Sequence, residues 1–216
     1  MRKINYVAIL HLIVLNSCSD SLDYNIERKF KSLIANDNCL IEFYFPEIRL
    51  KDSRLNLIEL NDLLEQFPDY KYQGHRCDEA NVNKRIVKGD YKIMLQEDDI
   101  LSIEFMTHIS QVGEQSTRTV YHSLVMNPKK FNENKYSLDP ESLFSNFDRK
   151  VLKKHVENFN KTNDPTVNLL AYNTGSNYAI TWGLTKETFI LYVGGEGEAF
   201  GYDKIEIPID EIKNNR

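Results

Sequence analysis

The chain has 216 residues, of which 27 are Lys or Arg and 32 are Asp or Glu, so its formal net charge is -5 at pH 7. This acidic balance argues against nucleic acid as a partner, because phosphate binding needs clustered Lys and Arg. The length suffices for one large domain or two small ones with a substantial core. A negative surface is compatible with a basic protein partner. The alternative is that this modest charge only keeps the protein soluble.

The N-terminus has the parts of a secretory signal. A basic start at Arg2 and Lys3 is followed by an apolar run over 4–15 and by a small residue before Cys18. The run is too short for a membrane-spanning helix, which needs about 20 apolar residues. The segment 15–18, Leu-Asn-Ser-Cys, resembles the signal of bacterial lipoproteins, in which the cysteine is lipidated, with palmitate among the acyl groups, and becomes the new N-terminus.

We therefore expect a signal peptide over 1–17, a lipidated tether over 18–36 and a folded domain over 37–216. The protein would be exported and anchored by lipid to the cell envelope, at the outer membrane on its periplasmic or surface side. Removing 1–17 leaves 25 basic and 32 acidic residues, a net charge of -7. Cys39 and Cys77 are then an even pair in an oxidising compartment, which favours a disulfide between them. Two unpaired thiols remain the alternative.

The first predicted element of the folded domain is a strand over 38–45, which is rich in aromatic and β-branched residues. A helical stripe follows at about 56–67 and stops at Pro68. Residues 68–90 are predicted to be mostly loop. Three strands over 91–96, 99–108 and 119–126 then form an antiparallel meander. In the second of these strands, apolar residues alternate with Ser102 and Glu104, which is typical of a half-buried strand.

The second half of the chain begins with a clear helix start, in which Asp139 precedes Pro140. An apolar face predicts that this helix runs to about residue 160. Strands are expected at 178–181, 188–193 and 204–209. The resulting order is typical of the α+β class, with antiparallel meanders on which the two helices at about 56–67 and 140–160 pack.

No catalytic constellation and no cofactor motif stands out in the sequence. The histidines have no spacing typical of a metal site. His108 and His122 lie on the two arms of one predicted hairpin and could meet across it, but satisfied surface or core histidines are the simpler interpretation. We therefore assign no catalytic residue, no metal site and no cofactor.

The glycine-rich segment 194–202 is the best candidate for a partner-binding loop. It is not a phosphate loop, because it lacks the following Lys-Ser/Thr and contains two glutamates. Two other interpretations remain, a calcium site that includes Asp203 and a simple turn between strands. The partner-facing hypothesis concerns two acidic and two aromatic side chains, Glu196, Glu198, Phe200 and Tyr202. Nearby, Trp182 is predicted to be a core anchor rather than a sugar platform.

Several segments together resemble the RsiV-like C-terminal domain family, with a module like the N-terminal part of the deacetylase PdaC before it. The segments that carry the resemblance are Leu40–Ile48, Leu60–Leu64, Tyr91–Phe105, Tyr136–Phe144, Trp182–Val193 and Phe200–Ile212. They span about residues 38–212. The chain departs from the family at 194–198, where members often carry a Tyr/Pro-rich stretch. The catalytic metal motif of the deacetylase is also absent.

The resemblance implies a non-enzymatic extracytoplasmic domain, since the RsiV domain binds lysozyme. We therefore expect an envelope lipoprotein that binds a protein or a cell-wall-derived ligand, with a basic, lysozyme-like hydrolase as the implied partner. Two alternatives remain open at this point. One is an enzyme that acts on cell-wall polymer, and the other is a periplasmic immunity protein that neutralises a toxin.

Overall fold

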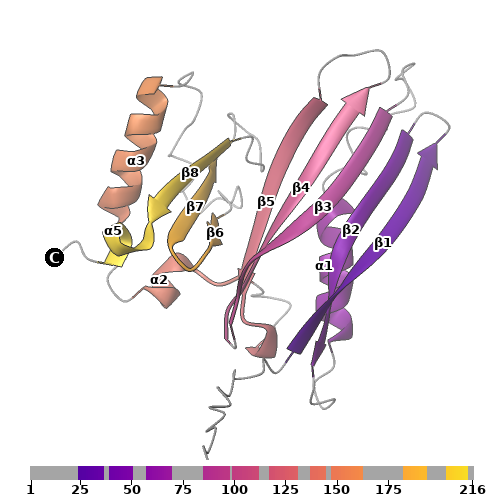
Figure 1. Ribbon diagram of the computed structural model, residues 1–216, viewed down its shortest axis with the longest axis horizontal. Coiled ribbons are helices and arrows are strands. Elements are labelled where there is room, and N and C mark those ends of the chain that lie inside the picture. The colour runs from indigo at the N-terminus through magenta and orange to yellow at the C-terminus, as the bar shows by residue number, and fades with distance from the viewer. Residues whose placement is uncertain are drawn as a thin grey trace, which may run out of the picture.

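Two β-sheets and the helices that cover them make up the described part of the chain (Figure 1). The computed structural model describes residues 24–36, 39–50, 57–69, 85–97, 99–111, 117–130, 137–144, 147–162, 182–193 and 203–213. The predicted α+β class is confirmed. None of the helices in these ranges is both long and apolar enough to cross a bilayer.

The larger sheet has five strands in the order β1-β2-β3-β4-β5. The strands are β1 (Tyr24–Asn36), β2 (Cys39–Leu50), β3 (Arg85–Gln96), β4 (Leu101–Gln111) and β5 (Thr117–Met126). All neighbours are antiparallel except β2 and β3, which pair in parallel. Helix α1 (Ile58–Asp69) lies in the connection between these two strands, as a parallel pair requires.

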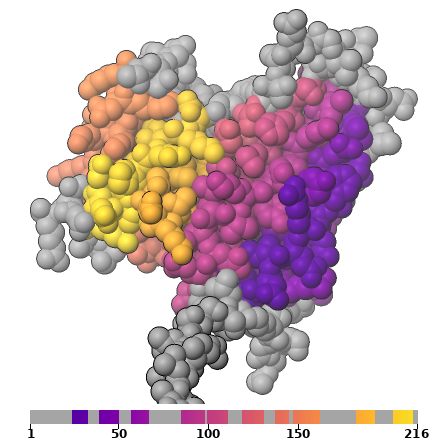
Figure 2. Space-filling view, viewed as in Figure 1, coloured from indigo at the N-terminus to yellow at the C-terminus, as the bar shows by residue number. Residues whose placement is uncertain are grey.

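The smaller sheet has the order β6-β7-β8 and is antiparallel. Its strands are β6 (Trp182–Leu184), β7 (Thr188–Val193) and β8 (Asp203–Pro208). Helices α2 (Pro140–Leu143), α3 (Arg149–Thr162) and α5 (Ile209–Lys213) accompany it, and the short 3-10 helix η1 (Pro128–Lys130) follows β5. Figure 2 shows the segments of the smaller sheet lying directly against the strands of the larger one.

The two faces of the larger sheet contribute to different cores. On one face, Leu101, Ile103 and Phe105 of β4 pack with Leu60 and Leu64 of α1. On the other face, Leu95 and Val125 join a core built by the smaller sheet and α3. The predicted wet face of β4 is therefore wrong: Ser102 and Glu104 are buried as well. Local periodicity could not reveal this, because the covering strands lie about 80 residues later in the chain.

Residues 24–36 form an edge strand rather than the second half of the predicted tether. This strand pairs on one side only, with β2, and over residues 24–32 every side chain except that of Tyr24 is at least partly exposed. Lys29 and Lys31 are satisfied there by carboxylates of neighbouring elements, Glu47 and Glu65. Because such a strand needs no apolar alternation, its sequence has the same composition as a solvated tether.

The predicted helix over 140–160 is divided into α2 and α3. Phe144 leaves the helix with an extended backbone and packs into the core, where its ring stacks on Phe147 at 6.2 Å. Asp148 then begins α3, since its Oδ1 accepts a hydrogen bond from the backbone N–H of Lys150 at 2.8 Å. The apolar stripe is continuous across the break, so it could not show that the axis is interrupted. The helix start at Pro140 is confirmed.

Candidate functional site

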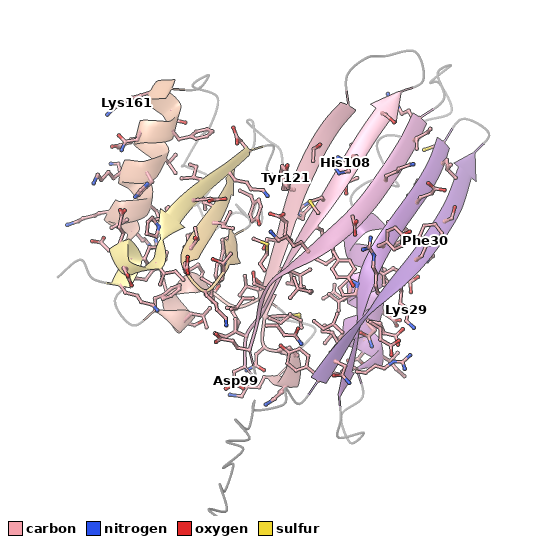
Figure 3. The ribbon with its side chains drawn as sticks, viewed as in Figure 1. Lys29, Phe30, Asp99, His108, Tyr121 and Lys161 are labelled. Carbon is pink, nitrogen blue, oxygen red and sulfur yellow. The ribbon has the colours of Figure 1, made fainter. Side chains whose placement is uncertain are left out.

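A single line of side chains crosses the larger sheet on the face that also meets the smaller sheet. The strand register aligns Phe30 with Tyr44, Asp90 with Met106 and Met106 with Tyr121. Five neighbouring strands span roughly 19 Å at the usual strand spacing. We call these five residues, together with Arg28, the cross-strand row. Figure 3 labels its two ends, Phe30 on β1 and Tyr121 on β5.

The outer end of the cross-strand row is exposed and well ordered by its own contacts. Phe30 and Tyr44 are 54% and 38% exposed, and their ring centroids lie 5.0 Å apart. The guanidinium carbon of Arg28 lies 4.0 Å from the centroid of the Tyr44 ring. The same guanidinium donates to both carboxylate oxygens of Asp90, at 2.9 and 2.8 Å. Both bonds come from one nitrogen, Nη2, and together with the Tyr44 ring they hold the guanidinium between β2 and β3.

The inner end of the cross-strand row meets a buried acid cluster. Lys204 of β8 lies over the ring of Tyr121, with 4.1 Å from its nitrogen to the centroid. Its ammonium contacts Glu104 Oε2 at 2.6 Å, and the hydroxyl of Tyr192 donates to the same oxygen at 2.6 Å. We call Glu104, Tyr192 and Lys204 the inter-sheet acid cluster. It joins β4 of the larger sheet to β7 and β8 of the smaller one.

Two further contacts bring the sheets close enough for this cluster to form. The backbone N–H of Leu184 donates to Ser102 Oγ at 2.9 Å. At Gly183, a Cβ would lie 3.0 Å from both Ser123 Oγ and Tyr192 Oη. A side chain at this position would require Ser123 or Tyr192 to shift by a few tenths of an ångström, so glycine allows the close approach of β6 to the larger sheet.

The inter-sheet acid cluster is closed rather than poised for chemistry. The Glu104 side chain is only 3% exposed, and one of its oxygens already has two donors. A buried charge needs such partners, since desolvation otherwise penalises the charged form. The cluster therefore fixes the smaller sheet on the larger one and leaves the exposed part of the row as the accessible surface.

The cluster also predicts alkaline sensitivity. Burial, and then the hydrogen bond to Glu104, raise the pKa of Tyr192 above its usual value of 10.0. The folded state thus holds the phenolic proton more tightly than the unfolded state, so this contribution to stability is complete below about pH 10 and is lost as the pH rises further. We expect the free energy of unfolding of the wild type to fall above pH 10. In Tyr192→Phe the fall should be less steep, by up to about 1.4 kcal/mol per pH unit. Urea unfolding at pH 9–11, followed by Trp182 fluorescence, measures both slopes, and equal slopes would contradict the assignment.

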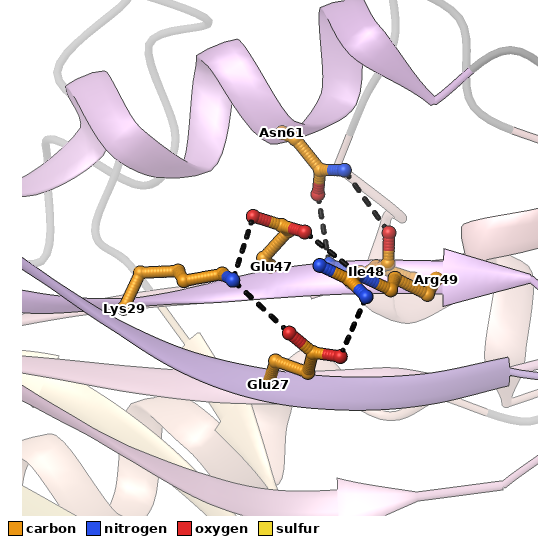
Figure 4. A network of polar contacts seen from close by, with 6 residues as sticks. All are labelled: Glu27, Lys29, Glu47, Ile48, Arg49 and Asn61. Carbon is orange, nitrogen blue, oxygen red and sulfur yellow. Dashed lines mark hydrogen bonds and ion pairs between the residues drawn. The ribbon is translucent and has the colours of Figure 1, made fainter.

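A second polar network lies on the β1–β2 hairpin (Figure 4). Lys29 Nζ contacts Glu27 at 3.0 Å and Glu47 at 3.5 Å. Arg49 contacts the same two carboxylates, each at 2.9 Å. The hydrogen bond that Glu47 accepts from Arg49 lowers the pKa of Glu47, and the one that Lys29 donates to Glu27 raises the pKa of Lys29. Two cations and two anions thus neutralise one another, so the network stabilises the hairpin and offers little net charge to a ligand.

Helix α1 is attached to the same hairpin by one amide side chain, as Figure 4 also shows. Asn61 Oδ1 accepts from the backbone N–H of Ile48 at 2.8 Å, and Asn61 Nδ2 donates to the carbonyl of Ile48 at 3.0 Å. The bonds replace the backbone partner that β2 lacks after it separates from β3 beyond residue 43. Asn61 therefore positions α1 rather than a ligand.

The histidines predicted to meet across the hairpin do not do so. His122 is aligned with Phe105, whose side chain belongs to the core on the α1 face. His108 is aligned with Thr119 and exposes its ring, with Nδ1 2.9 Å from Thr119 Oγ1. The two positions are three register steps apart, an odd number, so their side chains project to opposite faces. Within the described ranges, no group of three or more His, Cys, Asp or Glu is arranged to hold a metal ion.

Most of the predicted site residues lie outside the described residues: Cys18, Cys77, Glu196, Glu198, Phe200 and Tyr202. Cys39 is buried at the start of β2, and its bridge to Cys77 stays a prediction. The expectation for Trp182 is confirmed, because it is 7% exposed and stacks on Phe189 at 5.3 Å. The cross-strand row was missed, because it depends on strand register. Its only sequence signal is an aromatic residue in each arm of the first hairpin.

Comparison with known proteins gives structural similarity only. No family model matches the sequence, and no curated protein matches it significantly. A protein from Pseudomonas aeruginosa PAO1 is similar over 88% of this chain and 92% of its own, with a TM-score of 0.48 and 12% identity. A protein from Bacteroides fragilis NCTC 9343 is similar over 90% and 93%, with a TM-score of 0.47 and 11% identity. Both structural neighbours are DUF3298 family proteins. DUF3298 is a domain of unknown function.

Proposed function

We propose that this protein is a non-enzymatic lipoprotein of the cell envelope, anchored through Cys18, whose domain binds a protein partner through the exposed end of the cross-strand row. The observation that carries the proposal is the pairing of Phe30 with Tyr44 beside a fixed guanidinium. Among the described residues, the exposed large hydrophobic side chains are these two and Ile58. Two of the three therefore lie next to each other on one open sheet face.

The shape and chemistry of this surface favour a protein over a small molecule. Small ligands are usually bound in concave pockets, whereas the row lies on a sheet face. Tyr, Phe and Arg are enriched at the centres of protein interfaces. Arg28 is already held by Tyr44 and Asp90, so little side-chain entropy is lost when a partner covers it. The side chains are thus preorganised for contact.

The partner that the RsiV-like resemblance implies is a lysozyme-like hydrolase. Such hydrolases are basic, and this chain without residues 1–17 has 25 basic and 32 acidic residues. Opposite net charges increase the rate of encounter and contribute less to the final affinity. We therefore expect binding to become slower at high salt, while the aromatic contacts determine how long the complex lasts. A cell-wall-derived ligand is the alternative occupant of the same surface.

Replacing the exposed aromatic pair should weaken partner binding without unfolding the domain. In Phe30→Ser/Tyr44→Ser, we expect affinity for lysozyme to fall at least about tenfold, because truncated interface anchors each cost more than about 1 kcal/mol. The matched control is Ile58→Ser, which removes an even more exposed apolar side chain outside the row. Calorimetric titration at low salt compares the variants. Absence of wild-type binding at micromolar concentrations removes lysozyme as the partner, and an equal loss in Ile58→Ser removes the row as the site.

A further inference from the structure

One end of the larger sheet collects the chain segments that lie nearest to the predicted lipid anchor. Tyr24 begins β1, and its hydroxyl donates to the carbonyl of Glu97 at 2.8 Å, in the turn between β3 and β4. Leu101 begins β4 and is aligned with Met126, which ends β5. We call this side of the sheet the near end. Figure 3 labels Asp99 there.

The sequence leaves little chain between the near end and the anchor. Residues 19–23 separate Cys18 from Tyr24. Even a fully extended chain reaches at most about 22 Å over the six Cα–Cα steps from 18 to 24. The strands are longer than this reach, since the 11 residues of β4 span about 35 Å. A lipid on Cys18 therefore restricts the near end to the immediate neighbourhood of the bilayer.

The near end also exposes an apolar side chain. Ile58 in the first turn of α1 is 63% exposed. The preceding Leu57 packs on the core cluster that contains Tyr24 and Met126, which places this turn at the near end. Lys130 of η1, which follows β5 directly, is exposed there too. Glu59, Glu97 and Asp99 are exposed at the same end, so the short tether, rather than attraction to anionic headgroups, is what holds this end at the bilayer.

We propose that the near end, with Ile58, the turn at Asp99 and η1, rests on the membrane surface, and that the strands of the larger sheet rise away from it. This inference rests on the proposed lipidation of Cys18. It gives the cross-strand row a defined position, because Phe30 lies six residues along β1 from Tyr24, or about 20 Å at the rise of a strand. The binding surface is then held above the lipid headgroups and stays open to a partner from the aqueous side.

Orientations in which the domain lies with a face of the larger sheet on the bilayer are less compatible with the fold. One face of the larger sheet is covered by α1 and the other, in part, by the smaller sheet. A domain lying on either face would press these layers on the bilayer and bring both ends of the strands to similar depth. The two orientations therefore differ in one measurable quantity, the difference in depth between the two ends of a single strand.

The test uses the lipidated full chain in vesicles of phosphatidylethanolamine and phosphatidylglycerol with quencher-labelled headgroups. A fluorescent amino acid replaces either Asp99, before β4, or His108, near its far end, both of which are exposed. We expect quenching at least about threefold stronger at 99, because nine residues of strand separate the positions by about 30 Å. Equal quenching, or stronger quenching at 108, overturns the proposal.

Two controls separate this inference from the proposed function. Vesicle flotation comes first: if the wild type does not float, or if Cys18→Ala floats equally well, the lipid anchor itself is wrong. If flotation depends on Cys18, only the orientation is in question. An insertion of about 12 Gly and Ser residues after Ser21 lengthens the flexible reach and should weaken the contrast between 99 and 108. An unchanged contrast would show that the short tether does not set the orientation.

Discussion

Truncation of one buried carboxylate, in Glu104→Ala, is expected to destabilise the domain by about 3–5 kcal/mol, the usual cost of breaking a buried ion pair from one side. The variant leaves the ammonium of Lys204 and the hydroxyl of Tyr192 without the oxygen on which both converge. It also leaves a cavity between the two sheets. Urea denaturation followed by the fluorescence of Trp182 measures the loss.

Two further variants test whether the loss arises from the unpaired groups. Glu104→Gln keeps an oxygen for the Tyr192 hydroxyl but removes the charge beside Lys204, so we expect an intermediate cost of about 1.5–3 kcal/mol. A triple replacement, Glu104→Leu with Lys204→Met and Tyr192→Phe, removes every polar member of the cluster. Because a buried ionic group can be replaced by apolar residues at little cost, the triple variant should be more stable than Glu104→Ala. If the triple variant is instead less stable than Glu104→Ala, the polar groups of the cluster stabilise the fold and do more than set the relative position of the two sheets.

The inter-sheet acid cluster shows where sequence reasoning ends for this fold. The alternation in β4 correctly indicates a strand and identifies Leu101, Ile103 and Phe105 as one buried face. The opposite face has the composition of a wet surface, yet Glu104 is buried by Tyr192 and Lys204. Periodicity describes one strand and its immediate surroundings. It holds no information on a second sheet that arrives much later in the chain.

The cross-strand row was unpredictable for a different reason. Its members come from five strands. Their alignment depends on the register of β1–β2, β3–β4 and β4–β5, and Arg28 connects Tyr44 to Asp90 just beyond the last β2–β3 pair. A slip of one residue in any pair would move a side chain to the other face. The strands around Phe43, Ile103 and Leu191 were identifiable because each has a local apolar pattern. The register between them is set by turns and by packing, neither of which a single strand encodes.

These two features explain why the proposed function is one of binding. The row continues from an open aromatic end at Phe30 to an inner end at Tyr121, where Lys204 connects it to the closed, charge-compensated inter-sheet acid cluster. The cluster fixes the smaller sheet beside the row, and the open end remains for a partner. A binding surface of this kind needs fixed side chains rather than reactive groups. Arg28 fixes the outer end of the row through Asp90, and Lys204 fixes the inner end through the ring of Tyr121.

Removal of the aromatic centre of the second core, in Phe189→Ala, should cost about 3–5 kcal/mol, as expected for a fully buried phenylalanine. Phe189 of β7 has no exposed surface and contacts the rings of Phe144, Phe147 and Trp182 at 5.3–6.5 Å between centroids. Those three rings come from the segments around α2, α3 and β6, so the truncation weakens the whole attachment of the smaller sheet. The stacked partner Trp182 is the single tryptophan of the chain, and its emission should shift to longer wavelength in the folded variant.

The same substitution at an exposed strand position provides the matched control. Phe30→Ala removes an identical side chain from β1, where the ring is 54% exposed, so we expect a cost below about 1 kcal/mol, mainly from lost strand propensity and the pair with Tyr44. The ratio of the two costs separates the structural core from the proposed binding surface. If Phe30→Ala were as destabilising as Phe189→Ala, the exposed ring would belong to the folding core, and its place in a partner interface would lose its support. If Phe30→Ala keeps its stability but loses partner binding, the two aromatic groups have divided roles, one in holding the sheets together and one in recognition.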